Sequence, residues 1–525
     1  MKCGIFSQNE WLFTDSRVDE GKGRADLFLL KKQTGAFQVI ISDIEIGQPV
    51  AVTCQGLDGV TVTAYREKDV CVNRNTNDVH NGALTTEDWD VVASRHRVRK
   101  APYRTYDALV PIEGLVSEAS QEVYYVTLCP NESAKSDSYE GIMTFVFGEK
   151  SISFLVGLQV GNKTLPEQTL KLTNWYSYPN MAWSHGLKYG SDEHVEMVKK
   201  YFDLLNECGN NVFWCTFDLT KATEENGKIT FDFSEPKKRA QLALDCGAKI
   251  LEWAPIISRP TWEDPPFLVW DYRNDTRGPN VLSTGGRKYF TAFLTAFNDM
   301  LTEMGWRDIS IVHVSDEPKE LCASDFRIIC GIVRKYLPGI KLVDAIEIFF
   351  LQDALDIYVP KDHYFQMNKN DFEDLRDDRN EIWFYTCNMP GGRWLNRFID
   401  SPLLNTRLLH WGNYRFNLTG YLHWGFNHIA NDQDPFEQTS RNAGLPAGDT
   451  HIVYPYGDKV LRSLRFMQMK CGVEDYEILR ALSLSDKTVA DKICRRAMYA
   501  FDEYITDVEE FDKIQKELVA AYDAI

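Results

Sequence analysis

The sequence predicts an α/β fold in two parts. An N-terminal all-β sandwich covers residues 1–165, and a TIM-like (β/α)8 barrel with C-terminal helices covers residues 166–525. The chain has 525 residues, more than one ordinary hydrophobic core covers. Short strand-like runs between turn signals fill the first part, and strand-like runs alternate with helix-like runs in the second. A turn-rich segment at 161–166 separates the two patterns.

β-Branched and aromatic residues dominate the strand-like runs of the first part. Predicted strands cover residues 38–41, 50–54, 60–65 and 123–128. Residues 142–147 and 151–156 predict a hairpin around the short loop Gly148-Glu149-Lys150. No amphipathic helix pattern interrupts these runs, which favours a sandwich.

In the second part, eight strand-like runs are expected to form the barrel. They cover residues 170–176, 211–217, 248–254, 309–315, 341–344, 356–359, 381–386 and 420–425. Helices are predicted after the capping residue Ser191, at 235–246, around 290–301, at 321–337, near 396–409 and repeatedly within 459–525. A long loop rich in Trp, Asp and Pro occupies residues 255–286. Functional side chains are expected at the C-terminal strand ends, where barrel enzymes carry their active sites.

Composition narrows the function classes. The net charge of −18 argues against a nucleic-acid ligand, whose phosphates repel an acidic surface. The 12 Cys and 10 His do not follow metal-ligand spacing, so we expect neither a metal nor another cofactor.

No apolar run approaches the ~18 residues of a membrane span. The N-terminus has no signal-peptide pattern, which predicts a cytoplasmic protein. Abundant Trp (13) and Tyr (24) suit stacking on sugar rings. The oligomeric state stays open.

The most informative motif is Ile-Val-His-Val-Ser-Asp-Glu-Pro at residues 311–318. It reads as a buried strand that ends in the adjacent carboxylates Asp316 and Glu317. Two crowded carboxylates repel each other, so the pKa of one tends to rise while the pKa of the other stays low. One protonated and one charged carboxyl group are what acid-assisted cleavage of a glycosidic bond needs. The alternative is structural: Ser315 or Asp316 caps the next helix, with Pro318 in its first turn.

Strand parity separates the two carboxylates. Glu317 shares its side of the strand with His313 and Ser315, the polar candidates for the barrel interior, whereas Asp316 alternates with them. Both can reach one site only if the strand has ended or bulged by Asp316. Glu317 is therefore the firmer catalytic candidate.

Other unusual side chains follow the predicted strands. Trp175, Tyr385, Trp424 and Asn427 are candidates for substrate binding at the ends of the first, seventh and eighth strands. Barrel glycosidases with a protein nucleophile commonly place a carboxylate at the end of strand seven. Here that strand has only Glu381, at its opposite end. The substrate is then expected to supply the nucleophile, through the oxygen of a 2-acetamido group.

Several segments resemble glycoside hydrolase family 123. They are Ser315–Pro318, Trp383–Tyr385, Arg407–Trp411, Gly420–Asn427, Asp449–Pro455 and Gly-Val-Glu-Asp-Tyr-Glu at 472–477. The resemblance implies a β-N-acetylgalactosaminidase with an N-terminal sandwich and a catalytic barrel. It implies that Asp316 orients the acetamido group and that Glu317 is the acid and base. It adds Trp383, Arg407 and Trp411 as candidate substrate contacts.

The residues are compatible with three functions. The first is a retaining, exo-acting β-N-acetylhexosaminidase that acts on a small glycan or glycoconjugate. The second is a barrel glycosidase for a sugar without an acetamido group, in which Glu252 or Asp344 completes a pair with Glu317. The third is a non-catalytic glycan-binding protein, against which the Asp-Glu pair argues.

Overall fold

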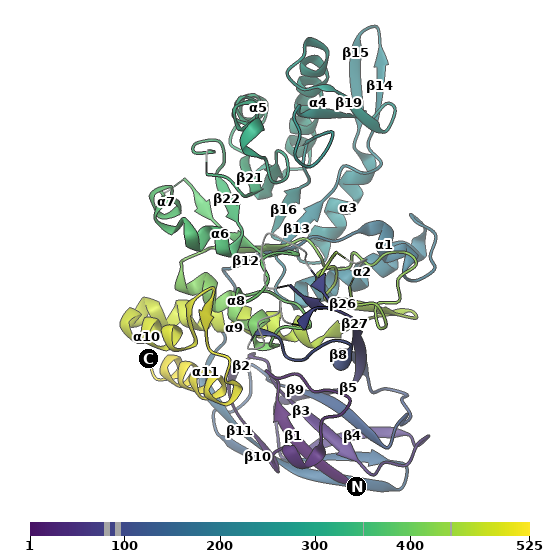
Figure 1. The fold of residues 1–525 in the computed structure, drawn as a ribbon, viewed down its shortest axis with the longest axis vertical. Helices are drawn as coiled ribbons and strands as arrows, with labels where there is room; N and C mark the ends of the chain where they lie inside the picture. Colours follow the sequence, from purple (N-terminus) through teal and green to yellow (C-terminus); the bar gives the residue numbers. More distant parts are fainter. Residues whose placement is uncertain (78–84, 90–95, 350, 378, 441–443) are drawn as a thin grey trace.

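The computed structural model describes residues 1–77, 85–89, 96–349, 351–377, 379–440 and 444–525. It has the predicted mixed α/β character: a strand-rich N-terminal region lies at the bottom of Figure 1, and the alternating part lies above it. Among the described residues, no helix combines the length and apolar character that crossing a membrane requires.

The strand-rich region consists of two sheets around one apolar core. The larger sheet has the order β1-β3-β9-β5-β8-β27-β26, and the smaller has the order β2-β11-β10-β4. Their N-terminal strands are β1 (Lys2–Ser7), β2 (Arg24–Lys31), β3 (Gly35–Ser42), β4 (Val50–Gln55), β5 (Val60–Val72), β8 (Tyr103–Pro111), β9 (Gln121–Pro130), β10 (Ser138–Phe147) and β11 (Lys150–Thr164). The predicted hairpin is confirmed as β10–β11, and Gly148 at its turn has a φ of 61°. Val39, Val126 and Phe145 fill the core between the sheets.

Two late strands complete the larger sheet. β26 (Val453–Tyr456) and β27 (Lys459–Ser463) form a hairpin, and β27 pairs with β8. The prediction of helices alone after residue 459 therefore missed β27. Helices do follow, as α9 (Leu464–Ser485), α10 (Lys487–Ala497) and α11 (Val508–Asp523). Because residues from both ends of the chain share this sheet, the division at residue 165 stays a prediction.

The eight predicted strand positions of the second part are all occupied, in order. They are β12 (Lys171–Asn174), β13 (Val212–Cys215), β16 (Ile250–Trp253), β20 (Ser310–His313), β21 (Lys341–Ile346), β22 (Ile357–Pro360), the broken strand β23 (Glu381–Ile382) and β24 (Phe384–Tyr385), and β25 (Gly420–His423). Where neighbouring strands pair, they are parallel. Their C-terminal ends therefore meet on one side, which is where the Asp-Glu pair lies.

A continuous closed barrel is not present in the described residues, because the strands fall in two sheets, which separate within the broken strand β23–β24 and between β12 and β13. Asparagine side chains lie at the β12–β13 junction instead. Asn210 Oδ1 accepts a hydrogen bond from Asn174 N at 2.7 Å, and Asn211 Oδ1 accepts one from Leu172 N at 3.0 Å. These contacts satisfy backbone groups that a strand partner would otherwise satisfy.

The helices up to residue 415 are α1 (Tyr178–Trp183), α2 (Asp192–Glu207), α3 (Ser234–Asp245), α4 (Thr284–Glu303), α5 (Ala323–Tyr336), α6 (Asp362–Met367), α7 (Lys369–Asp374) and α8 (Leu404–Arg415). Of these, α2, α3, α4, α5 and α8 correspond to predicted helices, whereas the short helices α1, α6 and α7 were not predicted. Ser191 caps α2 as expected, its hydroxyl accepting from His194 N at 3.3 Å. The helix predicted near 396–409 begins later, at Leu404, because Pro402 disfavours a helical conformation in the residue before it.

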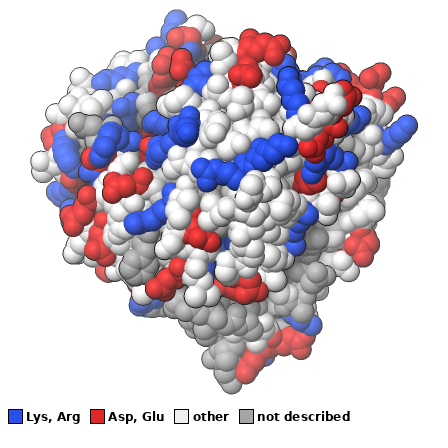
Figure 2. Space-filling view, turned by 90° about the horizontal axis from the view of Figure 1, so that it is seen from above, with Lys and Arg blue, Asp and Glu red and all other residues white. Residues whose placement is uncertain are grey.

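The long loop after the third strand is more ordered than predicted. It contains a three-stranded sheet of β17 (Ile257–Ser258), β18 (Leu268–Asp271) and β19 (Thr276–Asn280). A hairpin of β14 (Lys221–Glu225) and β15 (Lys228–Asp232) projects before α3. On the face seen in Figure 2, acidic and basic side chains intermingle and do not form a single basic patch.

Candidate active site

The backbone turns sharply where the fourth strand delivers its two carboxylates. β20 ends at His313, so the alternation of a strand has stopped before Asp316. Glu317 has a φ of 42°, a left-handed conformation that costs a non-glycine residue about 1–3 kcal/mol. Arg259 holds the turn by donating to the carbonyl oxygens of Asp316 at 2.7 Å and Glu317 at 3.1 Å. Strain held in this way is typical of a functional site.

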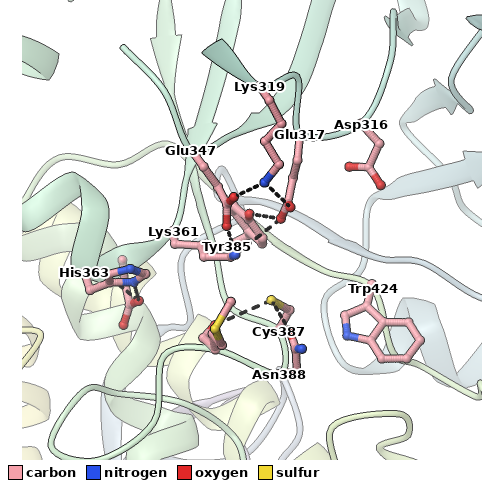
Figure 3. Close-up of polar contacts among 12 residues, drawn as sticks. Asp316, Glu317, Lys319, Glu347, Lys361, His363, Tyr385, Cys387, Asn388 and Trp424 are labelled. Atoms are coloured by element: carbon pink, nitrogen blue, oxygen red, sulfur yellow. Dashed lines mark hydrogen bonds and ion pairs between the residues drawn. The ribbon is translucent and has the colours of Figure 1, made fainter. Parts of the chain in front are cut away.

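Glu317 lies in a cluster of charged side chains from neighbouring strand ends (Figure 3). The Tyr385 hydroxyl donates to its Oε1. Lys361 Nζ lies 3.4 Å from Oε1, and Lys319 Nζ lies 3.9 Å from Oε2. Glu347 accepts from both lysines, one at each carboxylate oxygen. Glu317 is 8% exposed, so these neighbours control its environment more than bulk water does.

Asp316 is half-buried and lies to the side of this cluster in Figure 3. Burial, the adjacent Glu317 carboxylate and Asp344 raise the pKa of Asp316 to about 8. Asp316 therefore holds a proton near neutral pH.

Three buried side chains, His313, Glu252 and Asp344, contact one another next to the turn. His313 Nε2 lies 2.7 Å from Glu252 Oε1, and its Nδ1 lies 3.1 Å from Asp344 Oδ1. Burial opposes the charge on His313, but the hydrogen bonds to Asp344 and Glu252 raise its pKa to about 10. Asp344 Oδ2 also accepts from Ser315 N at 2.9 Å, which fixes the residue before the pair. Glu252 and Asp344 are fully buried, so the structure does not support either as the second carboxylate of a catalytic pair.

Two of the predicted aromatic contacts lie at strand ends with part of the ring exposed. Trp175 stacks on Trp214, with ring centroids 4.0 Å apart, and its Nε1 donates to Glu252 at 3.1 Å. Trp424 Nε1 donates to Asp449 Oδ1 at 3.3 Å. Each indole is held by a buried carboxylate, and both remain candidates for stacking on a sugar.

Four other predicted contacts need correction, because their side chains are occupied in the interior. Trp383 is fully buried, and its Nε1 donates to Glu381 Oε2 at 3.2 Å, at the opposite end of the strand. Asn427 is 1% exposed, and its amide bonds the backbone N (2.8 Å) and O (3.1 Å) of Ser177. Neither side chain is placed to contact a glycan.

Arg407 and Trp411 are also removed from the site. Both belong to α8, and both donate to Asp475 on α9: Arg407 Nε at 2.6 Å and Trp411 Nε1 at 2.9 Å from Oδ2. At 2% and 0% exposure, they hold two helices together. The Asp475 partner lies in the Gly-Val-Glu-Asp-Tyr-Glu segment, so this motif has a structural role here.

Lys361, Glu347 and Lys319 were not predicted from the sequence. Glu347 directly follows β21, Lys361 directly follows β22, and Lys319 comes two residues after Glu317. The strand-end rule that selected Asp316 would have found the first two, had it been applied to the short fifth and sixth strands. In the described part of the chain, no three His, Cys, Asp or Glu side chains form a group that could hold a metal ion.

Comparison with known proteins decides the family. The model of the glycoside hydrolase 123 catalytic domain matches residues 175–482, more than half of the chain. The chain belongs to glycoside hydrolase family 123. It is therefore a glycoside hydrolase, and the reading as a non-catalytic binding protein is not retained. The comparison with curated proteins found no match.

A solved structure of a family 123 enzyme has the same fold. A family 123 glycoside hydrolase from Clostridium perfringens, described for glycolipid glycan hydrolysis, has a TM-score of 0.75 at 15% identity, covering 99% of this chain and 96% of that one. An endo-β-1,4-mannanase from Thermotoga petrophila has a TM-score of 0.37 at 9% identity, covering 59% and 77%. The first match extends over both parts of the chain, which shows that the strand-rich region and the α/β part occur together in a family 123 enzyme.

The Tyr385→Phe substitution tests the link between strand seven and Glu317. Burial and Glu317 raise the pKa of Tyr385 well above its ordinary value, so the hydroxyl keeps its proton and acts as a donor. Removing it should lower kcat by roughly 10–10³-fold, the scale of losing one donor at a reacting centre. The melting temperature should change little, because the ring is retained. An unchanged kcat with a large fall in melting temperature would assign Tyr385 to the core alone.

The Asp316→Asn substitution tests how the raised pKa of Asp316 affects the stability of the folded protein. The pKa of Asp316 is about 8 in the folded protein and ~3.9 in an unfolded chain, so the folded state binds the proton more tightly. Stability from this group is present at low pH and is lost as pH rises from about 4 to 8. The melting temperature of Asp316→Asn minus that of the wild type should therefore increase over this window and level off above it. A difference that does not vary with pH would contradict the raised pKa.

Proposed function

We propose that this protein is a retaining, exo-acting β-N-acetylhexosaminidase, with β-linked N-acetylgalactosamine as its preferred sugar. The observation that carries the proposal is the arrangement at strand seven. Tyr385 stands at its C-terminal end, where a nucleophilic carboxylate would be needed, and its hydroxyl donates to Glu317. Glu381 lies at the opposite end, paired with Lys171 at 2.7 Å and Lys341 at 2.8 Å. The 2-acetamido oxygen of the substrate then serves as the nucleophile.

The first step divides the work between the two carboxylates. Asp316 accepts the acetamido N–H and directs the carbonyl oxygen toward the anomeric carbon. That oxygen forms a bond to the anomeric carbon as the glycosidic C–O bond breaks, and Glu317 donates its proton to the departing oxygen. The products are a cyclic oxazolinium ion, which ionised Asp316 stabilises, and the free aglycone. In the second step, ionised Glu317 takes a proton from water, and the water oxygen bonds to the anomeric carbon on the β face. The bond between that carbon and the acetamido oxygen breaks, which releases the sugar with its β configuration and its acetamido group restored.

Substrate binding also determines which of the two carboxyl groups, Asp316 or Glu317, holds the proton. Before the sugar binds, Asp316 holds a proton near neutral pH, because burial, Glu317 and Asp344 raise its pKa. A hydrogen bond from the acetamido N–H favours the ionised form of Asp316. Glu317 then becomes the protonated member, as the first step requires. A sugar without the acetamido group cannot cause this shift, which adds a second reason for selectivity.

The substrate is a terminal sugar on a glycan or glycoconjugate. The C. perfringens enzyme is described for glycolipid glycans, and such a glycan is one candidate here. A comparison of 4-nitrophenyl β-GalNAc, β-GlcNAc, β-galactoside and β-glucoside tests the proposal. The β-GalNAc substrate should be hydrolysed fastest, and the two sugars without an acetamido group should be almost inert. Rapid hydrolysis of the β-galactoside would favour a glycosidase that needs no acetamido group.

A further inference from the structure

Glu347 bridges two lysines that both face Glu317. Its Oε1 contacts Lys361 Nζ and its Oε2 contacts Lys319 Nζ (Figure 3). Lys361 is 2% exposed, so its charge cannot be screened by solvent and must be balanced by nearby carboxylates. Glu347 lies at the end of the fifth strand and reaches both ammonium groups from the side away from the Asp316 backbone.

Each ammonium group is closer to Glu347 than to Glu317. The separations from Glu317 are 3.4 Å for Lys361 and 3.9 Å for Lys319, longer than either contact with Glu347. Two ammonium groups within 4 Å strongly favour an ionised carboxylate in a buried site. A general acid, however, must hold its proton until the glycosidic bond breaks. The cluster therefore presents a conflict that a second carboxylate can resolve.

We infer that Glu347 is a positioning residue: it holds the ammonium groups of Lys319 and Lys361 and so allows Glu317 to carry the proton that hydrolysis uses. The inference rests on the proposed function of Glu317 as the acid. Glu347 touches neither the sugar nor the reacting atoms in this account. It acts through the two lysines.

Glu347 and Lys361 are both charged near neutral pH. Burial raises the pKa of Glu347, but Lys361 and Lys319 outweigh that effect and lower it overall. Burial opposes the charge on Lys361, but neighbouring acidic groups, Glu317 and Glu347 among them, raise its pKa overall. Near neutral pH, Glu347 is thus a carboxylate and Lys361 an ammonium group.

Other groups that face Glu317 also contribute to its environment. They are the adjacent Asp316, the Tyr385 hydroxyl, the Cys387 thiol, whose pKa burial raises, and Arg259, which contacts the backbone carbonyls of the turn. Glu263 lies 3.9 Å from Lys319, but its side chain is 70% exposed. Glu263 is therefore a natural control: it pairs with the same lysine as Glu347 but is screened by water.

The test is the pH dependence of kcat/KM on a methyl or disaccharide β-GalNAc substrate, whose leaving group needs a proton. In the wild type, activity should fall at high pH as the Asp316–Glu317 pair loses the proton that Glu317 passes to the leaving group. Glu347→Gln leaves the lysines to Glu317, so this alkaline limb should move down by about one pH unit, a loss of about tenfold at a pH above it. Lys361→Met should move the limb up. The double variant should lie between the two, and Glu263→Gln should match the wild type.

The outcomes separate this inference from the function on which it rests. If Glu347→Gln lowers activity equally at all pH values and the limb stays in place, Glu347 is only structural and the inference is overturned. If Glu347→Gln does not fold, an unmoved limb in Lys361→Met overturns it equally. Glu317→Gln should abolish the limb in an otherwise wild-type enzyme. A limb that survives this change overturns the acid role of Glu317 itself.

Discussion

Glu317→Gln is expected to lower kcat/KM by about 10²–10⁴-fold on glycosides with alkyl or sugar leaving groups. Glutamine keeps the shape of the side chain and can still accept from Tyr385, but it has no proton to donate to the departing oxygen. The loss should be much smaller on aryl glycosides with a good leaving group, which depart without protonation. Steady-state kinetics on a matched pair of alkyl and aryl β-GalNAc substrates gives the comparison.

The control for this variant is Glu320→Gln, an exposed carboxylate three residues further along the chain. It should leave the kinetics of both substrates unchanged. Equal losses on the alkyl and aryl substrates for Glu317→Gln would remove the acid role and leave a general electrostatic or structural one.

Asp316→Asn is expected to lower kcat by about 10²–10³-fold, the scale of removing one preorganised group that stabilises transition-state charge. Asparagine can still accept from the acetamido N–H, but it cannot balance the positive charge of the oxazolinium ion. Its melting temperature relative to the wild type should rise with pH, as described above. At the upper end of that pH range, the variant should therefore be more stable than the wild type but less active. This combination excludes misfolding as the cause of the lost activity.

A thiazoline analogue of the oxazolinium ion provides the second measurement for Asp316. It should bind tightly to the wild type, as intermediate analogues do, and much more weakly to Asp316→Asn. Equal affinity for the two proteins would show that Asp316 does not interact with the acetamido group.

Much of the fold could be predicted, because strand and helix patterns depend on local spacing. Even the short runs at 341–344 and 356–359 correspond to β21 and β22. The pairing of β27 with β8 could not be predicted, since it joins residues far apart in the chain. Nor could the β12–β13 junction, where Asn210 and Asn211 take over backbone hydrogen bonds that a strand ladder would otherwise make.

The two carboxylates of the site could be predicted from the sequence, but most of the side chains around them could not. The position of Asp316 and Glu317 after the fourth strand follows from a local motif. Whether an aromatic or cationic side chain faces a sugar or another helix depends on tertiary packing, which the sequence does not show. Arg407 and Trp411 illustrate this, because their partner Asp475 lies on a helix more than sixty residues away. The distribution of pKa values within the pair also depends on burial, and it placed the raised pKa on Asp316.

The central claim is that the substrate's own acetamido oxygen is the nucleophile. The most direct test is a series of 4-nitrophenyl β-GalNAc substrates whose N-acetyl group carries none, one, two or three fluorine atoms. Each fluorine withdraws electron density from the carbonyl oxygen and makes it a weaker nucleophile, while the sugar and leaving group stay the same. If the acetamido oxygen is the nucleophile, kcat/KM should fall at each step of the series. A flat series would contradict it and would require a nucleophile from the protein or from water.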